Sequence, residues 1–319
     1  MTDGSRFFGH EAMKFAQKRV GFPNRLAFML SPRRLRSTER ATGRKGSFES
    51  ETGVVSVFAY ATGKQAYFDL FMASCQRFGI EPILLGWGKP WVGFGHKTTE
   101  IRRAIQDLPG DDLVLSVDPF DVVFLTHPAE LEERYRPYRG KYVCGSLKLG
   151  RGLAAVYNAE FNKSGEAIPH TEFGYDHVNT GTWMANAACA RSVIDRLVEQ
   201  EKMTDKDMDQ ERLTGMYIRG DAEVALDWRC DLFHNLLFRD FLTRRPNLTD
   251  LEFAEGRVFN HTTKTWPCIL HASGNARMES IARSLGYPAE VARPASSQKN
   301  FTRKAIFHVQ QLASRLVGR

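Results

Sequence analysis

Two aspartates, Asp118 and Asp121, are the residues of this chain best suited to carry chemistry. They follow a strand-like apolar run, Leu113 to Val117, and precede a second one, Val122 to Leu125. Carboxylates at the exit of a buried strand are costly to leave without a partner, and paired carboxylate oxygens suit a hard divalent cation beside a phosphate. Asp-Pro is also common turn chemistry, so a strand that simply ends in a turn is the alternative at this point.

Strand and helix patterns alternate in the part of the chain that leads to these aspartates. Apolar runs and helical spacing predict strands over 54–59, 81–86 and 111–117, and helices over 65–78 and 97–108. This alternation implies parallel strands joined by right-handed crossovers. Ligands of such sheets bind beyond the carboxyl ends of the strands. The sequence therefore predicts an α/β fold with Asp118 at its binding edge.

The second half of the chain has a less regular pattern. It predicts strands over 141–147, 182–185 and 267–271, a strand pair at 224–226 and 232–233, a loop over 150–174, and helices over 187–200, 208–217 and 274–285. Asp205 or Asp207 is expected near the cap of the helix over 208–217. A final amphipathic helix is expected over 301–317.

The bulk composition is that of an ordinary soluble protein, with 42% hydrophobic and 25% charged residues among 319. No apolar run approaches the roughly 20 residues of a membrane span, and the N-terminus lacks the apolar core of a signal peptide. The five cysteines are scattered without a CxxC pair, which indicates neither a zinc knuckle nor a disulfide framework. We therefore expect a cytoplasmic protein with reduced thiols.

The net charge of +7 is unevenly distributed. Residues 1–50 carry a net +7 and residues 293–319 a net +6, which leaves −6 for the rest of the chain. We expect a basic N-terminal extension over 1–50, one domain over 51–290, and a basic amphipathic helix within 291–319. Such ends could hold a polyanion or an anionic membrane surface, or could only keep the protein soluble.

An ordered series of short motifs surrounds the aspartates. The segments are LGWGKPW at 85–91, GFGHK at 93–97, VDPFDVVF at 117–124, NTG at 179–181, DMDQ at 207–210, LDWRCDLFHNL at 226–236 and ILHASGN at 269–275. The series resembles the glycosyltransferase domain of the procollagen lysyl hydroxylase (PLOD) family and its viral and bacterial relatives, where the motifs read approximately LGxGxxW, GGGxK, DSYDV, LNSG, DDDQ, LDxxxxIFQNL and HGNG. The resemblance spans roughly residues 53–276. It implies a GT-A-like (Rossmann-like) fold, with a mostly parallel sheet flanked by helices.

The resemblance also implies roles for single residues. Metal ligands are implied at Asp118, Asp121 and His271, which would hold Mn²⁺ or Mg²⁺. Binding of the UDP-sugar donor is implied for Phe120 at the base, Lys97 near the diphosphate, Trp91 at the pocket wall, Gly274 in the phosphate loop, and Gln210. Asn179 and Asp209 are implied as catalytic residues on the side where sugar and acceptor meet.

The chain departs from the family pattern at three places. Ala272-Ser273-Gly274 follows His271 where the family has Gly-Asn-Gly, so the phosphate-loop motif is matched only in part. Met208 replaces an aspartate of the DDDQ run and thins the acidic cluster. Pro119-Phe120 stands where the family has Ser-Tyr, which removes a phenol hydroxyl.

Structural interpretations compete with these roles. A histidine after an apolar run can be a satisfied core residue, and Asp209 can simply cap or solvate a helix. Trp91 can be a loop anchor. Lys97 lies at the unfavourable end of a helix dipole, which a bound diphosphate would explain. Asp227 and Asn235 are interpreted as structural because they flank a strand.

The predicted function is a metal-dependent glycosyltransferase that moves glucose or galactose from a UDP-sugar to an acceptor hydroxyl. The resemblance implies hydroxylysine or galactosyl-hydroxylysine in a collagen-like protein as the acceptor. Three alternatives stay open: transfer to hydroxymethylated bases of phage DNA, transfer to an envelope glycan, and a non-catalytic protein that only binds the nucleotide-sugar. Neither the sugar nor the stereochemical outcome can be read from the sequence.

Overall fold

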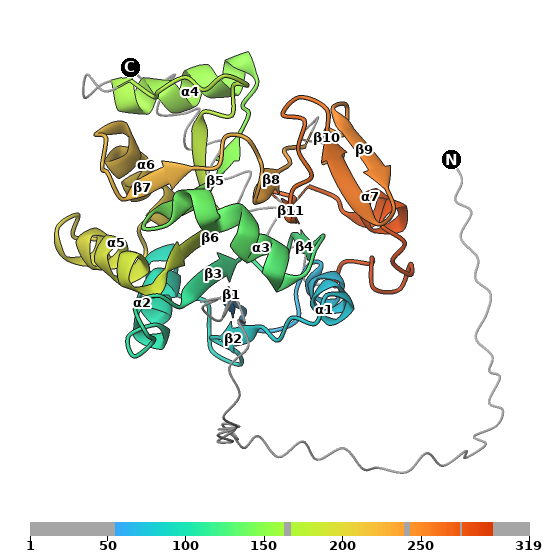
Figure 1. The fold of residues 1–319 in the computed structure, drawn as a ribbon, viewed down its shortest axis with the longest axis horizontal. Coiled ribbons are helices and arrows are strands. Elements are labelled where there is room, and N and C mark those ends of the chain that lie inside the picture. Colours follow the sequence, from blue (N-terminus) through green and yellow to red (C-terminus); the bar gives the residue numbers. More distant parts are fainter. Residues whose placement is uncertain (1–54, 163–166, 239–242, 275, 296–319) are drawn as a thin grey trace, which may run out of the picture. The chain divides into compact units, whose positions relative to one another are not determined.

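The computed structural model of the protein describes residues 55–162, 167–238, 243–274 and 276–295 (Figure 1). The strands are β1 (Val55–Tyr60), β2 (Ile83–Leu85), β3 (Leu113–Val117), β4 (Val122–Phe124), β5 (Tyr142–Leu147), β6 (His177–Asn186), β7 (Val224–Leu226), β8 (Phe233–Asn235), β9 (Leu251–Ala254), β10 (Arg257–Asn260) and β11 (Ile269–His271). The helices are α1 (Phe68–Arg77), α2 (Phe94–Ala104), α3 (Pro128–Tyr135), the short 3₁₀ helix η1 (Arg136–Tyr138), α4 (Arg151–Asn162), α5 (Ala187–Glu199), α6 (Asp209–Ile218) and α7 (Glu279–Ser284).

The strand that ends at Asp118 lies inside the main sheet. The strand order is β2-β1-β3-β6-β5-β7, and β1 pairs in parallel with both β2 and β3. β5 and β7 are also parallel, whereas β6 runs antiparallel to its neighbours β3 and β5. The prediction of an α/β fold with a mostly parallel sheet flanked by helices is confirmed.

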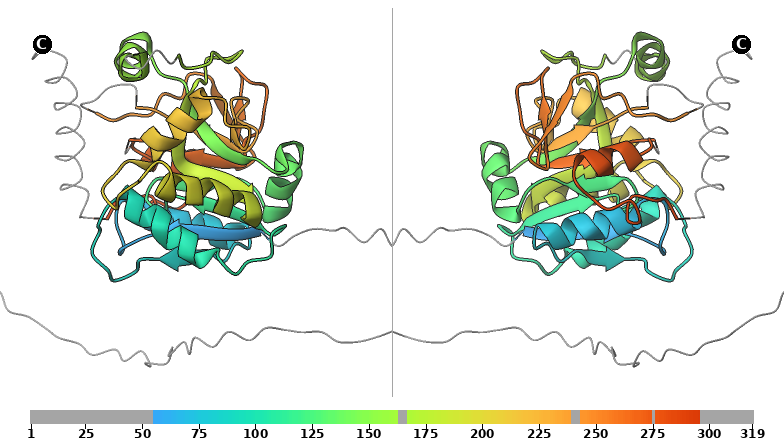
Figure 2. Two further views of the ribbon diagram at one scale, coloured as in Figure 1. Left: turned by 90° about the vertical axis from the view of Figure 1, so that its left-hand side faces the viewer. Right: turned by 90° about the vertical axis from the view of Figure 1, so that its right-hand side faces the viewer.

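Both faces of this sheet are covered, which explains the continuous apolar runs of its strands. Leu115 and Val117 of β3 pack into a core with α1, α3, β4, β8 and β11. Val114 of the same strand faces the opposite core, built with α2, α5 and α6. The two side views show helices on either side of the sheet (Figure 2). β3 is thus a rigid, fully buried support for the residues that follow it.

A second, smaller sheet with the order β4-β11-β8 brings distant segments to the aspartates. β11 pairs antiparallel with β4, and the register sets His271 opposite Val122. On its other side β11 pairs in parallel with β8, with His271 opposite Asn235. Since Val122 directly follows Asp121, this pairing places His271 beside the second aspartate. The separate hairpin β9–β10 lies outside this sheet.

Three expectations for the second half of the chain are wrong. Part of the loop expected over 150–174 is the helix α4, whose pattern was obscured by Gly150 and Gly152, two poor helix formers. β6 covers ten residues where a four-residue strand was expected, because pairing with both β3 and β5 extends it. Of the segment at 232–233, Phe233 begins β8 of the small sheet, and β8 does not pair with β7.

Asp207 lies next to Met208, the N-cap residue of α6, as expected, but α6 begins without a side-chain cap. The Asp207 carboxylate instead accepts from the Thr204 N–H at 2.7 Å. The helix expected over 274–285 is the shorter α7. The helix expected over 301–317 and the basic extension over 1–50 lie outside the described residues, so the domain boundaries stay predictions. Within the described ranges, no helix has the length and apolar character needed to span a membrane.

The buried His234 in β8 should make the free energy of unfolding sensitive to acid. Its ring is buried, its Nδ1 accepts from the Asn260 amide at 3.2 Å, and burial lowers the pKa of His234 to about 4. Because this lies below the ordinary value of about 6.5, the stabilisation is fully present above pH 6.5. It is lost as the pH falls towards 4, by on the order of 3 kcal/mol, as measured by denaturant unfolding across this pH range.

The substitution His234→Gln should remove this part of the acid slope. The control is His261→Gln, because His261 is half exposed and pairs with Glu252 on the surface. If the His234→Gln variant lost stability with acid as steeply as the wild type, the prediction would be wrong. Ring NMR of the wild-type protein gives a second test, since the His234 signal should not titrate between pH 7 and about 5.

Candidate functional site

The turn between β3 and β4 presents both aspartates at the carboxyl end of β3. The N–H of Asp118 donates to the Gly181 carbonyl of β6 at 2.8 Å, and the carbonyl of Asp121 accepts from Ala272 at 2.7 Å. The backbone on either side of the turn is therefore fixed to two other strands. The pair lies at the sheet edge that the sequence predicted as the binding edge.

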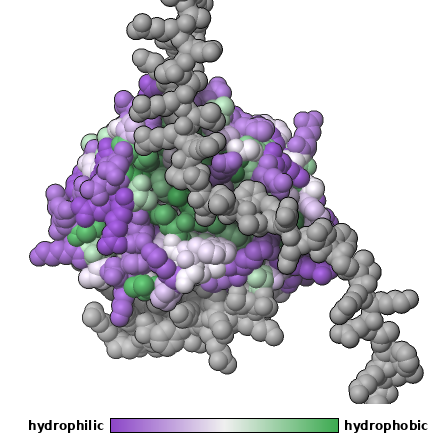
Figure 3. Space-filling model, turned by 90° about the horizontal axis from the view of Figure 1, so that it is seen from below, coloured by the Kyte–Doolittle hydropathy of each residue, from purple (hydrophilic) through white to green (hydrophobic). Residues whose placement is uncertain are grey.

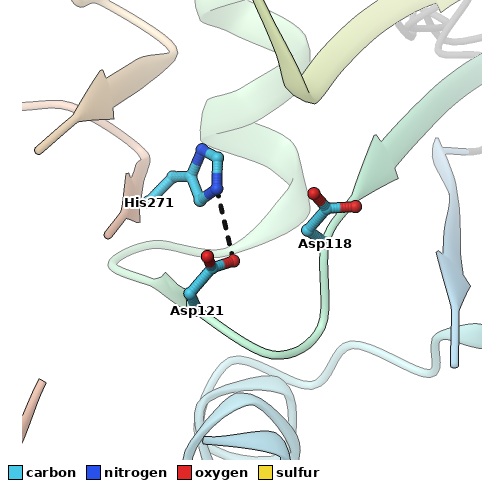
Figure 4. Close-up of side chains that lie close together, drawn as sticks. All are labelled: Asp118, Asp121 and His271. Atoms are coloured by element: carbon cyan, nitrogen blue, oxygen red, sulfur yellow. Dashed lines mark ion pairs between the residues drawn. The ribbon is translucent and has the colours of Figure 1, made fainter. Parts of the chain in front are cut away.

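His271, at the end of β11, completes a cluster of three possible metal ligands. One ligand atom from each of Asp118, Asp121 and His271 lies within 4.8 Å of the other two. The side chains come from different strand ends and converge on one space (Figure 4), with His271 Nε2 at 3.2 Å from Asp121 Oδ1. Two carboxylates and an imidazole are a suitable donor set for a divalent ion such as Mn²⁺.

The cluster carries one unsatisfied atom. Asp121 Oδ1 is buried and receives no hydrogen bond, although His271 Nε2 lies close to it. His271 Nδ1 contacts the side-chain oxygens of Asn235 at 2.6 Å and Ser273 at 3.1 Å. With the ring proton on Nδ1, the lone pair of Nε2 faces the lone pairs of Asp121 Oδ1. A cation between these two atoms would relieve that contact.

The pKa shifts of the cluster also indicate a site for positive charge. Burial raises the pKa of the Asp121 carboxyl. Burial lowers the pKa of His271, but the negative charges of Asp121 and Asp118 outweigh it and raise the pKa overall. The cluster therefore favours bound positive charge, whether a proton or a metal ion. These residues fit the implied divalent metal.

Lys97 supplies a buried positive charge beside the cluster. Its ammonium lies 3.0 Å from Asp118 Oδ1 and 3.9 Å from Asp209 Oδ2, and its side chain is 5% exposed. Burial lowers the pKa of Lys97, but the two aspartates raise it more, so the amine stays charged. It lies in the first turn of α2, whose N-terminal Gly95 and His96 N–H groups donate to the carbonyls of Asp207 and Asp205. This contact joins α2 to the start of α6.

Asp209, the first residue of α6, is surrounded by donors. Its carboxylate accepts from the Thr180 hydroxyl at 3.0 Å, from the Thr98 hydroxyl at 3.4 Å and from the Gln210 N–H at 2.8 Å. Burial raises the pKa of Asp209, and the Lys97 ammonium opposes this. Both oxygens accept hydrogen bonds, so the carboxylate is held in place beside the Lys97 ammonium.

Asn179 and Gln210 form a polar group next to Asp209. The Asn179 amide donates to Gln210 Oε1 at 3.5 Å, and its own Oδ1 accepts from the Gly181 N–H at 3.1 Å. The Gln210 amide donates to the Tyr157 hydroxyl of α4 at 3.4 Å. The helix that replaces the expected loop therefore contributes a residue to this side of the site.

Phe120 and Trp91 lie in two groups of aromatic rings near the carboxyl ends of β1, β2 and β3. The Phe120 ring is 6.5 Å from Phe68, which contacts Trp87 at 5.3 Å. Trp91 contacts Tyr60 and Phe94 edge-on. Among the described residues, four of the five strongly exposed large apolar side chains lie between Ile83 and Val92. Figure 3, viewed from the side of β2, shows apolar residues gathered on that face.

The structure brings seven of the ten predicted site residues together in one contact network: Asp118, Asp121, His271, Lys97, Asp209, Asn179 and Gln210. Phe120 belongs to the metal-site turn and contacts Phe68. Trp91 packs against Tyr60 and Phe94. Gly274 is exposed and lies near the Phe238 ring. Sequence reasoning missed the site contacts of Asn235, Thr180 and Tyr157. Asn235 and Thr180 both stand in quoted motifs, Asn235 at the Asn of LDxxxxIFQNL and Thr180 within NTG at 179–181, whereas Tyr157 lies outside them.

The fold is an α/β fold with a cluster of possible metal ligands at the edge of its main sheet, and sequence comparison gives its family. The family described as the PLOD GT domain matches residues 51–287. The chain therefore belongs to the PLOD glycosyltransferase-domain family.

Individual relatives are distant. The uncharacterized protein R699 of Acanthamoeba polyphaga mimivirus is 25% identical over 65% of this chain and 43% of its own length. Procollagen-lysine,2-oxoglutarate 5-dioxygenase 1 of Bos taurus is 26% identical over 74% of this chain and 32% of its own length. The chain thus spans less than half the length of these relatives.

Two solved glycosyltransferase structures overlap with the chain more loosely. One is a glycosyltransferase involved in glycosylation of the major capsid of PBCV-1, with 12% identity and a TM-score of 0.37 over 72% of this chain and 98% of the other. The other is apo mouse xyloside xylosyltransferase 1, with 13% identity and a TM-score of 0.40 over 70% and 99%. At these scores the assignment rests on the family match and on the chain's own topology.

Proposed function

We propose that this protein is a metal-dependent glycosyltransferase that moves a hexose, glucose or galactose, from a UDP-sugar to an acceptor hydroxyl. The observation that carries the proposal is the convergence of Asp118, Asp121 and His271 beside the buried ammonium of Lys97. This arrangement provides both a cation site and a fixed positive charge at the binding edge of an α/β sheet. A nucleoside diphosphate needs both.

Each part of the network has a proposed task. Asp118, Asp121 and His271 would hold Mn²⁺ or Mg²⁺, which when bound neutralises charge on the departing diphosphate. Lys97 keeps its charge close to Asp118 and adds to the positive field at the diphosphate. The chain of contacts from Lys97 to Asp209 fixes this charge, so the cluster needs little reorganisation when charge develops.

Asp209, Asn179 and Gln210 are proposed to face the sugar. Because donors occupy both Asp209 oxygens, Asp209 is better suited to fix Lys97 and to stabilise positive charge on the sugar than to remove a proton. The amides of Asn179 and Gln210 supply polar groups for sugar hydroxyls. Tyr157 extends this group towards α4.

The nucleotide base is proposed to lie near Phe120 and Trp91. Trp91 is 43% exposed and held edge-on by two rings, so its face is available for stacking at low entropic cost. Gly274 has a φ of +70°, which keeps the loop after His271 in a conformation that favours glycine. That loop is the proposed place for phosphate contacts.

The acceptor is proposed from the relatives. The bovine relative is a procollagen-lysine dioxygenase by name, so hydroxylysine or galactosyl-hydroxylysine in a collagen-like protein is the first acceptor to test. Hydroxymethylated bases of phage DNA and envelope glycans are the other acceptors, with the basic ends as contacts to a polyanion or a membrane surface. The cytoplasmic location likewise stays a prediction.

A UDP-release assay tests the proposal. UDP-glucose, UDP-galactose and other UDP-sugars would be compared with Mn²⁺, with Mg²⁺ and with a chelator. A hydroxylysine peptide, a galactosyl-hydroxylysine peptide and hydroxymethylated DNA would be supplied as acceptors. We expect turnover of a UDP-hexose that depends on the metal and is raised by one class of acceptor.

Two results would reject the proposal. Turnover that is unchanged by the chelator would remove the metal site from the mechanism. Tight UDP binding without release of UDP from any sugar, in the presence of Mn²⁺ and all acceptors, would instead indicate a non-catalytic binding protein.

A further inference from the structure

Asn235 lies directly behind the proposed metal ligand His271. It is the last residue of β8 and is 4% exposed. The pairing of β8 with β11 sets it opposite His271, and its side-chain Oδ1 is 2.6 Å from His271 Nδ1. The second ring nitrogen of His271, Nε2, points to Asp121. One side of the ring is thus reserved for Asn235 and the other for the ligand cluster.

The orientation of the Asn235 amide follows from its second contact. Its Nδ2 donates to the Ser146 carbonyl at 3.0 Å, and a flipped amide would set two carbonyl oxygens against each other. Oδ1 therefore faces His271 Nδ1 and can only accept. In its neutral form the ring must carry its proton on Nδ1, which leaves the Nε2 lone pair directed at the cluster.

The Asn235 side chain lies close to the backbone of β5. A Cβ on Gly145 of β5 would lie 2.4 Å from Asn235 Nδ2, so glycine at this position allows the close approach. The register of β5 and β6 shifts between Cys144 and Gly145. The amide contacts Ser146 of β5 on one side and His271 of β11 on the other, and these two contacts fix its orientation.

We infer that Asn235 is a positioning residue that selects the His271 tautomer able to ligate a divalent metal. This inference rests on the proposed metal site and adds a residue to it. Outer hydrogen-bond partners of ligating histidines fix ring orientation and tautomer, and their loss typically costs about 10–100-fold in metal affinity. The role is indirect, since Asn235 would touch His271 and not the ion.

Mn²⁺ binding to the full chain, followed by electron paramagnetic resonance of the free ion, tests the inference. Asn235→Leu removes the acceptor at similar volume, and we expect Mn²⁺ affinity to fall about 10–100-fold. Asn235→Asp restores an acceptor for Nδ1–H but loses the donor to Ser146. We expect it to keep most of the Mn²⁺ affinity while lowering the melting temperature.

A purely structural role makes the opposite prediction, because Asn235→Asp adds a buried charge and should then bind Mn²⁺ no better than Asn235→Leu. That result would overturn the inference, as would wild-type affinity in Asn235→Leu. Ser273→Ala is the matched control, since Ser273 Oγ lies farther from the same nitrogen at 3.1 Å; a larger loss there than in Asn235→Leu would assign the role to Ser273. If Asn235→Leu does not fold, Asn235→Ala takes its place. Failure of the wild-type chain to bind Mn²⁺ would reject the metal site itself.

Discussion

Replacing Asp121 with asparagine is expected to reduce metal-stimulated UDP release by at least about a hundredfold, because a metal site contributes several kcal/mol to the transition state and each 1.36 kcal/mol is tenfold in rate. The change keeps the shape of the side chain and removes one charge from the three-residue cluster. Stability should behave differently. Asp121 Oδ1 is buried without a hydrogen bond, so the neutral amide should leave the metal-free protein as stable as the wild type or more stable.

The Asp121→Asn variant should thus lose UDP release without losing stability. Turnover and Mn²⁺ affinity would be measured together with the thermal midpoint of the metal-free protein. Asp195→Asn is the control, since Asp195 lies on α5 and pairs with Arg102 at a half-exposed position. If Asp121→Asn kept wild-type Mn²⁺ affinity, Asp121 would be excluded as a metal ligand. A large loss of stability in Asp121→Asn would instead show that Asp121 forms a stabilising ion pair with His271.

The first half of the fold was predictable because its strands are buried on both faces. β1 and β3 read as continuous apolar runs, and helical spacing lies between them, so the order of elements follows from local pattern. The same local pattern places Asp118 at a strand end. Here the tertiary structure adds little to what the spacing of apolar residues already requires.

The second half depended on contacts that no local pattern shows. β6 contains Gly181 between polar residues and would be a poor strand alone, but pairing on both sides makes it ten residues long. α4 begins between two glycines, and the propensity of that turn argues against a helix. In both segments tertiary packing outweighs local preference.

The candidate site also combines residues that the sequence indicated with contacts that depend on strand pairing. A histidine at the end of an apolar strand is not distinguishable from a core histidine by its neighbours in sequence, and only the order of motifs suggested His271. What joins it to Asp121 is the antiparallel register of β11 and β4. Asn235 has only a structural interpretation in the sequence, because its contact with His271 depends on a third strand of the same small sheet.

Gly181→Ala is expected to disable the site through one added methyl group. Gly181 lies in β6 between the two parts of the network, and its carbonyl accepts from Asp118. A Cβ at this position would lie 2.2 Å from His271 Cε1 and 2.8 Å from Nε2. The imidazole must move, since β6 is held on both sides. Misplacement of a catalytic group by about 1 Å can cost about a hundredfold in rate, and Mn²⁺ affinity should fall with it.

The added strain should also lower stability by about 1–3 kcal/mol, as overpacking in a close-packed interior does. Gly110→Ala is the matched control, because a Cβ there would make only an ordinary 3.4 Å contact with Ala188 near the start of β3. The double variant Gly181→Ala/His271→Ala separates the two effects. Without the ring, the alanine at 181 has room, so stability should recover relative to Gly181→Ala while turnover stays lost. If stability did not recover in the double variant, the methyl group would act on the β6 backbone and not on His271.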